Sequence, residues 1–517
     1  MRRIVLALAV VLAMLVPLRP LPAAASPLAW SPCPEDASAE CATLTLPVAW
    51  NATRGPTFDL AVARRRATDP ARRIGALVIN PGGPGGSGVD AVLRNSLGFT
   101  PLLRSRFDLV GFDPRGVGRS HPLLCSRDLA ARAPDPLMRT QADFEARLAH
   151  NARYARDCRA RTGPLYDHVD TGSVVRDLDA LRAALGEERL TYYGVSYGTL
   201  IGQLYAERYP GRVRALALDS NMDHDLDTTA MFDTDTWTTQ DSFDEFAAWC
   251  AAAKECALHG RDVRALFADL RARAERGELH VPGAPEERLT LLPLLLRTFS
   301  DFYGPDWTHL AEFLRALDEG DDGDKSDKAP AAEEEFNDAT QVICQDYALP
   351  VRDQRDFERH LRRMARIAPD MRMTPISVSL IVACLGQPMP VPNPQHRLRV
   401  SGTPPLLLVN ALHDPATGYP WALSTARQIG REARLLTYDG WGHVVYGRGE
   451  CATGAVDRYL ISLALPRWGA HCPAENNRIP PHSRELSRPD SSYMRHRPIT
   501  SGAAGSPEVE AGGSRPA

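Results

Sequence analysis

The stretch Thr191-Tyr192-Tyr193-Gly194-Val195-Ser196-Tyr197-Gly198-Thr199 contains the pattern that decides the fold of this chain. Strand-forming residues lead into it, and a helix-compatible segment follows from residue 200 until Pro210 ends it. Gly-x-Ser-x-Gly between a strand and a helix predicts a sharp turn whose central serine has a strained backbone, with glycines where a Cβ would collide. We therefore expect Ser196 to be an exposed nucleophile. An ordinary strand-to-helix turn is the alternative.

Length and charge allow a globular protein with a large core. The chain has 517 residues, a formal net charge of -4 and a hydrophobic fraction of 44%. These values fit a soluble protein long enough for a full α/β core plus an inserted region. Nothing in the charge balance indicates a nucleic-acid partner.

The N-terminus has the three parts of a secretory signal peptide. Met1-Arg2-Arg3 is positive, residues 4–16 are apolar, and Ala23-Ala24-Ala25 offers small residues for cleavage. A retained anchor is the alternative, but the apolar run has no polar face and is too short to span a bilayer. We expect cleavage after Ala25 and secretion, and no other segment is expected to cross or bind a membrane.

The cysteine count fits an oxidising compartment. There are ten cysteines, an even number, and none forms a Cys-x-x-Cys pair that would indicate a metal site. We therefore expect disulfides and no metal. Spacing suggests the local pairs Cys33 with Cys41, Cys125 with Cys158, Cys250 with Cys256, Cys344 with Cys384, and Cys451 with Cys472.

Buried strands alternate with helices in two parts of the chain. Nearly continuous apolar runs predict parallel strands, and the apolar stripe of residues 171–185 predicts an amphipathic helix. From about residue 223 to 400 this alternation stops, and residues 243–253, 262–273 and 357–367 are expected to be helices. An acidic run at 318–335 is expected to be a solvated loop. The predicted strands are 42–50, 56–63, 74–80, 107–113, 190–193, 213–218, 404–410 and 433–438.

These patterns predict a mostly parallel sheet with helices on both faces and an inserted, mainly helical cap. The tail is rich in Pro, Arg, Ser and Gly and is expected to be disordered. The predicted parts are a signal peptide (1–25), the first part of the core (26–222), the cap (223–400), the second part of the core (401–472) and the tail (473–517).

The glycine-rich segment 81–88 follows the strand at 74–80 and allows two interpretations. It matches a dinucleotide-binding fingerprint, with Asp108 at the distance of a ribose ligand. Alternatively, it is an oxyanion loop that precedes a nucleophile elbow. We favour the second, because Pro84 removes a donor and a secreted enzyme meets little NAD.

A serine hydroxyl needs an imidazole and a carboxylate to become a good nucleophile. In sheets of this type these partners follow the serine in the order acid, histidine, each after a later strand. Asp414 and His443 lie at such positions, with Asp219 as a rival acid at the end of another strand. His413 is expected to be a packing neighbour, and His259, His280 and His471 surface residues. The expected oxyanion donors are the backbone N–H groups of Tyr197 and Gly83.

These motifs together resemble the secreted tripeptidyl aminopeptidases of the prolyl-iminopeptidase-like branch of the α/β-hydrolases. The resemblance is carried by segments 80–88, 111–118 and 194–199 and by the segments around Asp414 and His443, and it extends from Cys33 to Cys472. The last two cysteines resemble the family's C-terminal domain.

The resemblance implies a serine exopeptidase without a cofactor that cuts short peptides from free N-termini. It also makes Asp346, in Cys344-Gln345-Asp346, the candidate for binding the substrate ammonium, with a solvated cap aspartate as the equal alternative. Where relatives tend to have Gly and Pro, residues 220–224 read Ser-Asn-Met-Asp-His, which leaves specificity open.

We therefore expect acyl transfer to water through a covalent Ser196 intermediate. A carboxylesterase of the same fold and a non-catalytic secreted binding protein are the alternatives. An intact Ser, Asp and His set argues against the binding protein, because a binder has no use for the strained elbow. The length of the released peptide and the oligomeric state stay open, with a monomer favoured.

Overall fold

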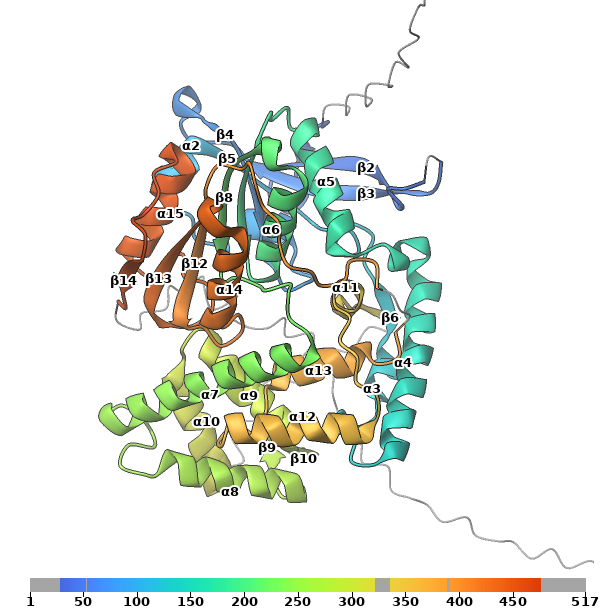
Figure 1. Cartoon of the computed structure of the whole chain (residues 1–517), viewed down its shortest axis with the longest axis vertical. Helices are drawn as coiled ribbons and strands as arrows, with labels where there is room; N and C mark the ends of the chain where they lie inside the picture. The colour runs from blue at the N-terminus through green and yellow to red at the C-terminus, as the bar shows by residue number, and fades with distance from the viewer. Residues whose placement is uncertain (1–27, 53, 321–334, 388–390, 476–517) are drawn as a thin grey trace, which may run out of the picture.

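The computed structural model describes residues 28–52, 54–320, 335–387 and 391–475 (Figure 1). The predicted signal peptide, most of the acidic run and the tail beyond residue 475 lie outside the described residues. The described part of the chain forms a sheet of 10 strands in the order β1-β2-β3-β5-β4-β7-β8-β12-β13-β14.

The sheet is antiparallel at its N-terminal end and parallel from β5 onwards. Every residue of β4, β5 and β7 is buried, as parallel strands covered on both faces require. The parallel order brings the carboxyl ends of β4, β7, β8, β12 and β13 to one edge. The strands are β1 (Ser31–Pro32), β2 (Glu40–Pro47), β3 (Thr57–Arg65), β4 (Gly75–Asn80), β5 (Phe107–Phe112), β7 (Leu190–Val195), β8 (Val213–Asp219), β12 (Leu406–His413), β13 (Ala433–Trp441) and β14 (Ala470–Pro473).

Helices cover both faces of the sheet and divide its core in two. Successive strand residues alternate between the layers, so Leu77 and Ile79 pack in one and Ala76 and Val78 in the other. One layer contains α1 (Gly88–Arg94), α2 (Pro101–Arg106) and α15 (Glu450–Ser462), and the other contains α5 (Thr171–Ala184), α6 (Tyr197–Arg208) and α14 (Tyr419–Ile429). This confirms the predicted α/β-hydrolase architecture.

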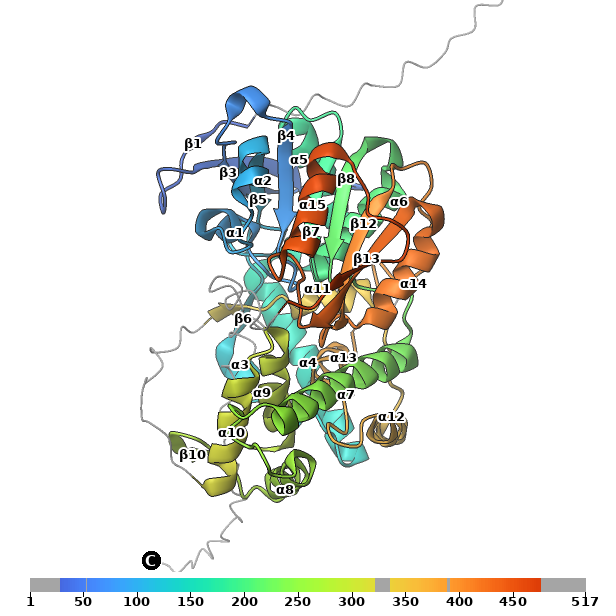
Figure 2. The same cartoon turned by 90° about the vertical axis from the view of Figure 1, so that its left-hand side faces the viewer.

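Helices between β8 and β12 form a second layer at the carboxyl edge of the sheet (Figures 1 and 2). A small hairpin of β9 (His280–Val281) and β10 (Ala284–Arg288) accompanies them. The helices are α7 (Thr228–Ala252), α8 (Val263–Arg276), α9 (Leu291–Tyr303), α10 (Trp307–Glu319), α11 (Thr340–Asp346), α12 (Gln354–Ile367) and α13 (Pro375–Cys384).

A segment that precedes the elbow also joins this cap layer. β6 (Leu124–Ser126) pairs with β11 (Glu335–Asn337), and α3 (Arg127–Ala131) and α4 (Gln141–Thr162) follow β6. On α4, the Asn151 amide donates to the carbonyls of Val382 (2.9 Å) and Leu385 (3.0 Å) at the end of α13. The sequence does not indicate this contribution, because α4 is a polar helix without a strong apolar stripe.

Five disulfides connect the described elements. They join Cys33 to Cys41, Cys125 to Cys158, Cys250 to Cys256, Cys344 to Cys384, and Cys451 to Cys472. The fourth ties α11 to α13 within the cap, and the fifth ties α15 to β14 in the core. No helix among the described residues is long and apolar enough to cross a membrane.

Candidate active site

Ser196 lies in the sharp turn between β7 and α6, with φ 54° and ψ −122°. A Cβ on Gly194 would lie 2.5 Å from the Gly198 carbonyl oxygen, and one on Gly198 would lie 2.6 Å from Asn80 Oδ1. Both positions therefore require glycine. The turn has the strained backbone of a nucleophile elbow.

The glycine-rich loop after β4 lies directly against this elbow. A Cβ on Gly82 would be 2.3 Å from the Val195 carbonyl oxygen and 3.0 Å from the Tyr197 nitrogen. The loop is fixed from below by Asn80, whose Oδ1 accepts from the Gly82 N–H at 2.9 Å. Tyr197 is the first residue of α6, where a backbone N–H has no intrahelical acceptor. The neighbouring Gly83 has φ 111°.

The dinucleotide interpretation does not fit this geometry. Asp108 pairs with Ala76 near the start of the parallel strands, at the opposite end of β4 from the glycine loop. Its carboxylate accepts from the Ala67 N–H and from Arg73 Nε, each at 2.9 Å. Asp108 therefore holds the segment of Ala67 and Arg73 against the amino ends of the parallel strands, away from the glycine loop.

Asp414 and His443 meet at the ends of the neighbouring strands β12 and β13. His443 Nδ1 lies 2.9 Å from Asp414 Oδ1 and 3.1 Å from Oδ2, and the two residues are 4% and 0% exposed. Thr417 supports the acid, because its hydroxyl donates to Oδ2 at 3.0 Å and its N–H to Oδ1 at 3.0 Å. Burial works to raise the pKa of Asp414, but His443 and the N–H donors outweigh it and lower the pKa below its usual value. The acid therefore stays ionised against the imidazole.

The cap helix α9 reaches this imidazole. The backbone N–H of His443 donates to the backbone carbonyl of Tyr303 at 2.8 Å. The Tyr303 ring also packs edge-on against the imidazole, at a centroid distance of 5.1 Å. Arg448 Nη2 donates to the carbonyls of both Tyr303 (3.0 Å) and His443 (2.8 Å). The backbone of the histidine is therefore fixed by core and cap together.

Asp219, the rival acid, binds backbone instead of imidazole. Its carboxylate accepts from Val445 N–H at 2.9 Å and Tyr446 N–H at 2.8 Å, in the loop that follows His443. The Tyr193 hydroxyl also donates to it at 2.7 Å. The Asp219 carbonyl accepts from the Ser196 N–H at 2.9 Å. One residue therefore fixes both the elbow and the histidine loop at the same edge of the sheet.

The other four candidate histidines lie outside this arrangement. His413 Nδ1 lies 2.8 Å from Asp241 Oδ2 on cap helix α7, and its ring stacks on Trp441. His471 is exposed and lies 2.6 Å from Asp439. His259 lies beside the Cys250 carbonyl, and His280 is exposed on β9.

Asp346 lies at the end of α11 with no exposed surface. Its carboxylate accepts from four protein donors: the Thr171 N–H (2.8 Å), the Thr171 hydroxyl (2.5 Å), the Asn393 amide (2.6 Å) and the Tyr197 hydroxyl. Burial raises its pKa to about 7, the nearby charge of Asp170 adds to this, and the hydrogen bonds oppose it. Its assignment to the substrate ammonium stays a prediction.

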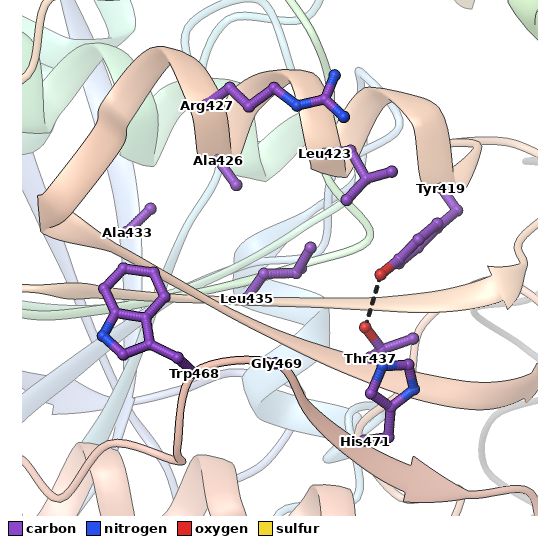
Figure 3. A pocket seen from close by; sticks show the side chains of 10 residues that line it. All are labelled: Tyr419, Leu423, Ala426, Arg427, Ala433, Leu435, Thr437, Trp468, Gly469 and His471. Carbon is purple, nitrogen blue, oxygen red and sulfur yellow. Dashed lines mark hydrogen bonds between the residues drawn. The ribbon is translucent and has the colours of Figure 1, made fainter.

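A cavity of about 310 Å³ lies elsewhere, between α14, β13 and the turn before β14 (Figure 3). Its lining includes Leu423, Leu435, Trp468 and His471, and a hydrogen bond of 2.7 Å joins Tyr419 to Thr437 across it. Neither Asp414 nor His443 lines it. Among the described residues, no group of three or more His, Cys, Asp or Glu side chains is arranged to hold a metal ion.

Residues 75–449 match the protein family described as alpha/beta hydrolase fold. The chain belongs to the α/β-hydrolase family. Within it, this hydrolase is similar to the serine protease Hip1 of Mycobacterium tuberculosis H37Rv, at 32% identity over 490 residues that cover 87% of this chain and 92% of that protein. The tripeptidyl aminopeptidase of Streptomyces lividans is 32% identical over 469 residues, which cover 85% of each chain.

An esterase is among the relatives of this α/β-hydrolase as well. Carboxylesterase B of Mycobacterium tuberculosis H37Rv is 33% identical over 484 residues, covering 87% of this chain and 91% of that protein. The predicted resemblance to tripeptidyl aminopeptidases is confirmed, and the relatives support a serine hydrolase. Peptidase and esterase names both occur among them at similar identity.

Proposed function

We propose that this α/β-hydrolase is a secreted serine exopeptidase that releases short peptides, tripeptides foremost, from free N-termini. The observation that carries the proposal is the buried Asp414–His443 pair at the edge where the Ser196 elbow ends. The tripeptidyl aminopeptidase relative supports the substrate class. Five disulfides support an extracellular location.

In the proposed reaction, Ser196 Oγ attacks the carbonyl carbon of the scissile bond while His443 Nε2 takes the hydroxyl proton. Asp414 holds the other nitrogen of the ring in the tautomer that this transfer requires. The oxyanion is stabilised by the N–H groups of Tyr197 and Gly83, each contributing about 2.7 to 4 kcal/mol. The C–N bond then breaks as His443 returns the proton to the leaving amine, and water, deprotonated by the same imidazole, hydrolyses the acyl-enzyme.

The nucleophile is tested by substitution and by labelling. Ser196→Ala should keep the circular dichroism spectrum and lose turnover. A serine-directed organophosphonate should label Ser196 alone, as read by peptide mass spectrometry. Label on another residue, or full turnover in Ser196→Ala, would exclude the proposed mechanism.

The substrate class is tested with three compounds: a tripeptide anilide with a free amino terminus, its acetylated form, and a simple aryl ester. A strong preference for the free amine is the expected result. A preference for the ester would instead favour the carboxylesterase, the second candidate, which the 33% identical carboxylesterase B supports. Anilides of one, two and three residues then give the length of the released peptide.

The proposal includes Asp346 as the carboxylate that recognises the substrate ammonium. Its position beneath the cap and the contact of the Tyr197 hydroxyl with it, directly after the nucleophile, support this role. In Asp346→Asn, activity on the free tripeptide anilide should fall more than activity on the acetylated form. An equal loss on both compounds would leave Asp346 with a structural role only.

A further inference from the structure

Cap helix α7 places four polar side chains along one face. Positions spaced by four, three and four residues share one face of an α-helix. Each of the four contacts residues that flank Asp414 or His443 in the chain. They are Thr234, Thr238, Asp241 and Glu245, and we call them the α7 stripe.

The N-terminal half of the stripe lies against the residues that follow the acid. Trp421 Nε1 donates to Thr234 Oγ1 at 2.8 Å. A Cβ on Gly418 would lie 2.0 Å from Thr238 Oγ1, so α7 packs directly on the backbone where α14 begins. The turn that contains Asp414 and Thr417 is therefore enclosed between α7 and the core.

The C-terminal half of the stripe binds the residues that precede the acid and the base. Asp241 Oδ2 lies 2.8 Å from His413 Nδ1, and Glu245 Oε2 accepts from Trp441 Nε1 at 2.7 Å. His413 is adjacent to Asp414 in the chain. Trp441 is two residues before His443.

The two bound residues also contact each other. The rings of His413 and Trp441 stack at a centroid distance of 6.1 Å, and the Gly442 N–H donates to the His413 carbonyl at 3.1 Å. Burial works to lower the pKa of His413, but the hydrogen bond and charge of Asp241 and the charge of Glu245 outweigh it and raise the pKa. Both charges come from α7, and Trp441 is neutral. The imidazolium form therefore makes a charge-assisted contact with the cap.

α7 is itself fixed to the rest of the cap from another face. The buried Asp235 accepts from the Ser377 hydroxyl at 2.5 Å and from the Thr374 hydroxyl, both at the start of α13. A helix held in this way offers its stripe to the core as a fixed surface. Both views show α7 on the side of the cap that faces the ends of β12 and β13 (Figures 1 and 2).

We propose that Asp241 and Glu245 are positioning residues that hold the acid and the base in register through His413 and Trp441. This inference rests on the proposed mechanism with Ser196, Asp414 and His443. It means that cap residues contribute to kcat. Small displacements in such a site cost up to about a hundredfold in rate. Removing either carboxylate should therefore lower kcat and leave KM nearly unchanged.

The experiment measures kcat and KM of Asp241→Asn and Glu245→Gln on the tripeptide anilide, together with the rate of inactivation by the organophosphonate. The matched control is Asp244→Asn on the same helix, because Asp244 faces solvent and pairs with Arg264 away from the stripe. The stripe variants should lose about tenfold to a hundredfold in kcat and in inactivation rate. The control should lose neither.

Two further measurements separate positioning from folding. Trp441→Phe removes the donor to Glu245 while keeping an aromatic ring, and it should lose about tenfold to a hundredfold in kcat. It therefore tests the contact even where Glu245→Gln does not fold. In a double-mutant cycle, His413→Gln combined with Asp241→Asn should be no worse than either single change. Additive losses would overturn the inference.

The remaining outcomes are distinct. A loss confined to KM would place the carboxylates in substrate binding and overturn the proposal, as would kcat values equal to that of the Asp244→Asn control. Full activity in Ser196→Ala would instead refute the proposed function itself. If Ser196→Ala is inactive, the proposed function stands, and the kinetics of Asp241→Asn and Glu245→Gln alone decide whether these residues have a positioning role.

Discussion

The hydroxyl of Thr417 contacts both members of the Asp414–His443 pair. It donates to Asp414 Oδ2 at 3.0 Å and lies 3.4 Å from His443 Nδ1. Thr417→Val keeps the shape and removes the donor. We expect kcat to fall about tenfold and the unfolding free energy by about 1 kcal/mol. Thr425→Val is the control, because it removes a buried hydroxyl that donates to the Met222 carbonyl, away from the pair. Equal kcat values in the two variants would contradict a role of Thr417 beside the acid.

Replacing Asp414 and Asp219 by asparagine should affect kcat and melting temperature to different extents. Asp414→Asn disturbs the imidazole tautomer, so kcat should fall by about 10⁴. Its melting temperature should fall as well, because Asp414 also accepts from the N–H groups of Ala416 and Thr417. Asp219→Asn removes a charged acceptor of two N–H groups and should lower the melting temperature first. Parallel kinetics and thermal unfolding measure both. A larger kcat loss in Asp219→Asn would move the role of the acid to Asp219.

The positions of Ser196, Asp414 and His443 were predictable because each directly follows a strand whose apolar run is visible in the sequence. The contacts of Tyr303 with His443 and of Asp241 with His413 were not predictable, because both residues lie on cap helices that carry no local motif. Thr417 had a signal, since a hydroxyl residue three positions after an aspartate can close a turn on its carboxylate.

The same contrast holds for whole elements. The parallel strands β4, β5, β7, β8, β12 and β13 were predicted to within a few residues because most of their residues are buried. α7 was expected at 243–253 and begins at Thr228. Its first half is rich in Thr and Asp, whose contacts are hydrogen bonds to α13 and α14, so no apolar period marks it. The polar helix α4 escaped prediction for the same reason.

Because α6 packs closely on β4, adding one methyl group at their contact should displace the whole helix. In Gly198→Ala the new Cβ would lie 2.6 Å from Asn80 Oδ1 and 2.8 Å from the Asn80 carbonyl, so α6 has to move away from the strand. We expect a loss of about 1 to 3 kcal/mol in unfolding free energy and loss of activity. Gly211→Ala, with nothing within 4 Å, should stay within about 0.5 kcal/mol. Urea unfolding measures both variants, and equal midpoints would contradict the packing argument.

Across the whole molecule, buried polar residues join the cap to the core in addition to the apolar cluster that the two layers share. Asp346 binds the elbow residue Tyr197 and the first residue of α5, and its backbone carbonyl lies 2.7 Å from His224 Nε2. Such a junction is sensitive to protonation, because a carboxylate without solvent depends entirely on its donors.

This junction should make folding stability depend on pH. Burial raises the pKa of Asp346 to about 7, above its value in the unfolded chain, so the folded state holds the proton more tightly between about pH 4 and 7. Its contribution to stability is therefore largest below about pH 4 and is lost as the pH rises through 7. Between pH 7.5 and 5 the unfolding free energy should gain about 2 kcal/mol from this group. Urea unfolding of the wild type at the two pH values measures the total change, and the difference from Asp346→Asn isolates the part due to Asp346. A wild-type slope retained in Asp346→Asn would show that another group carries the proton.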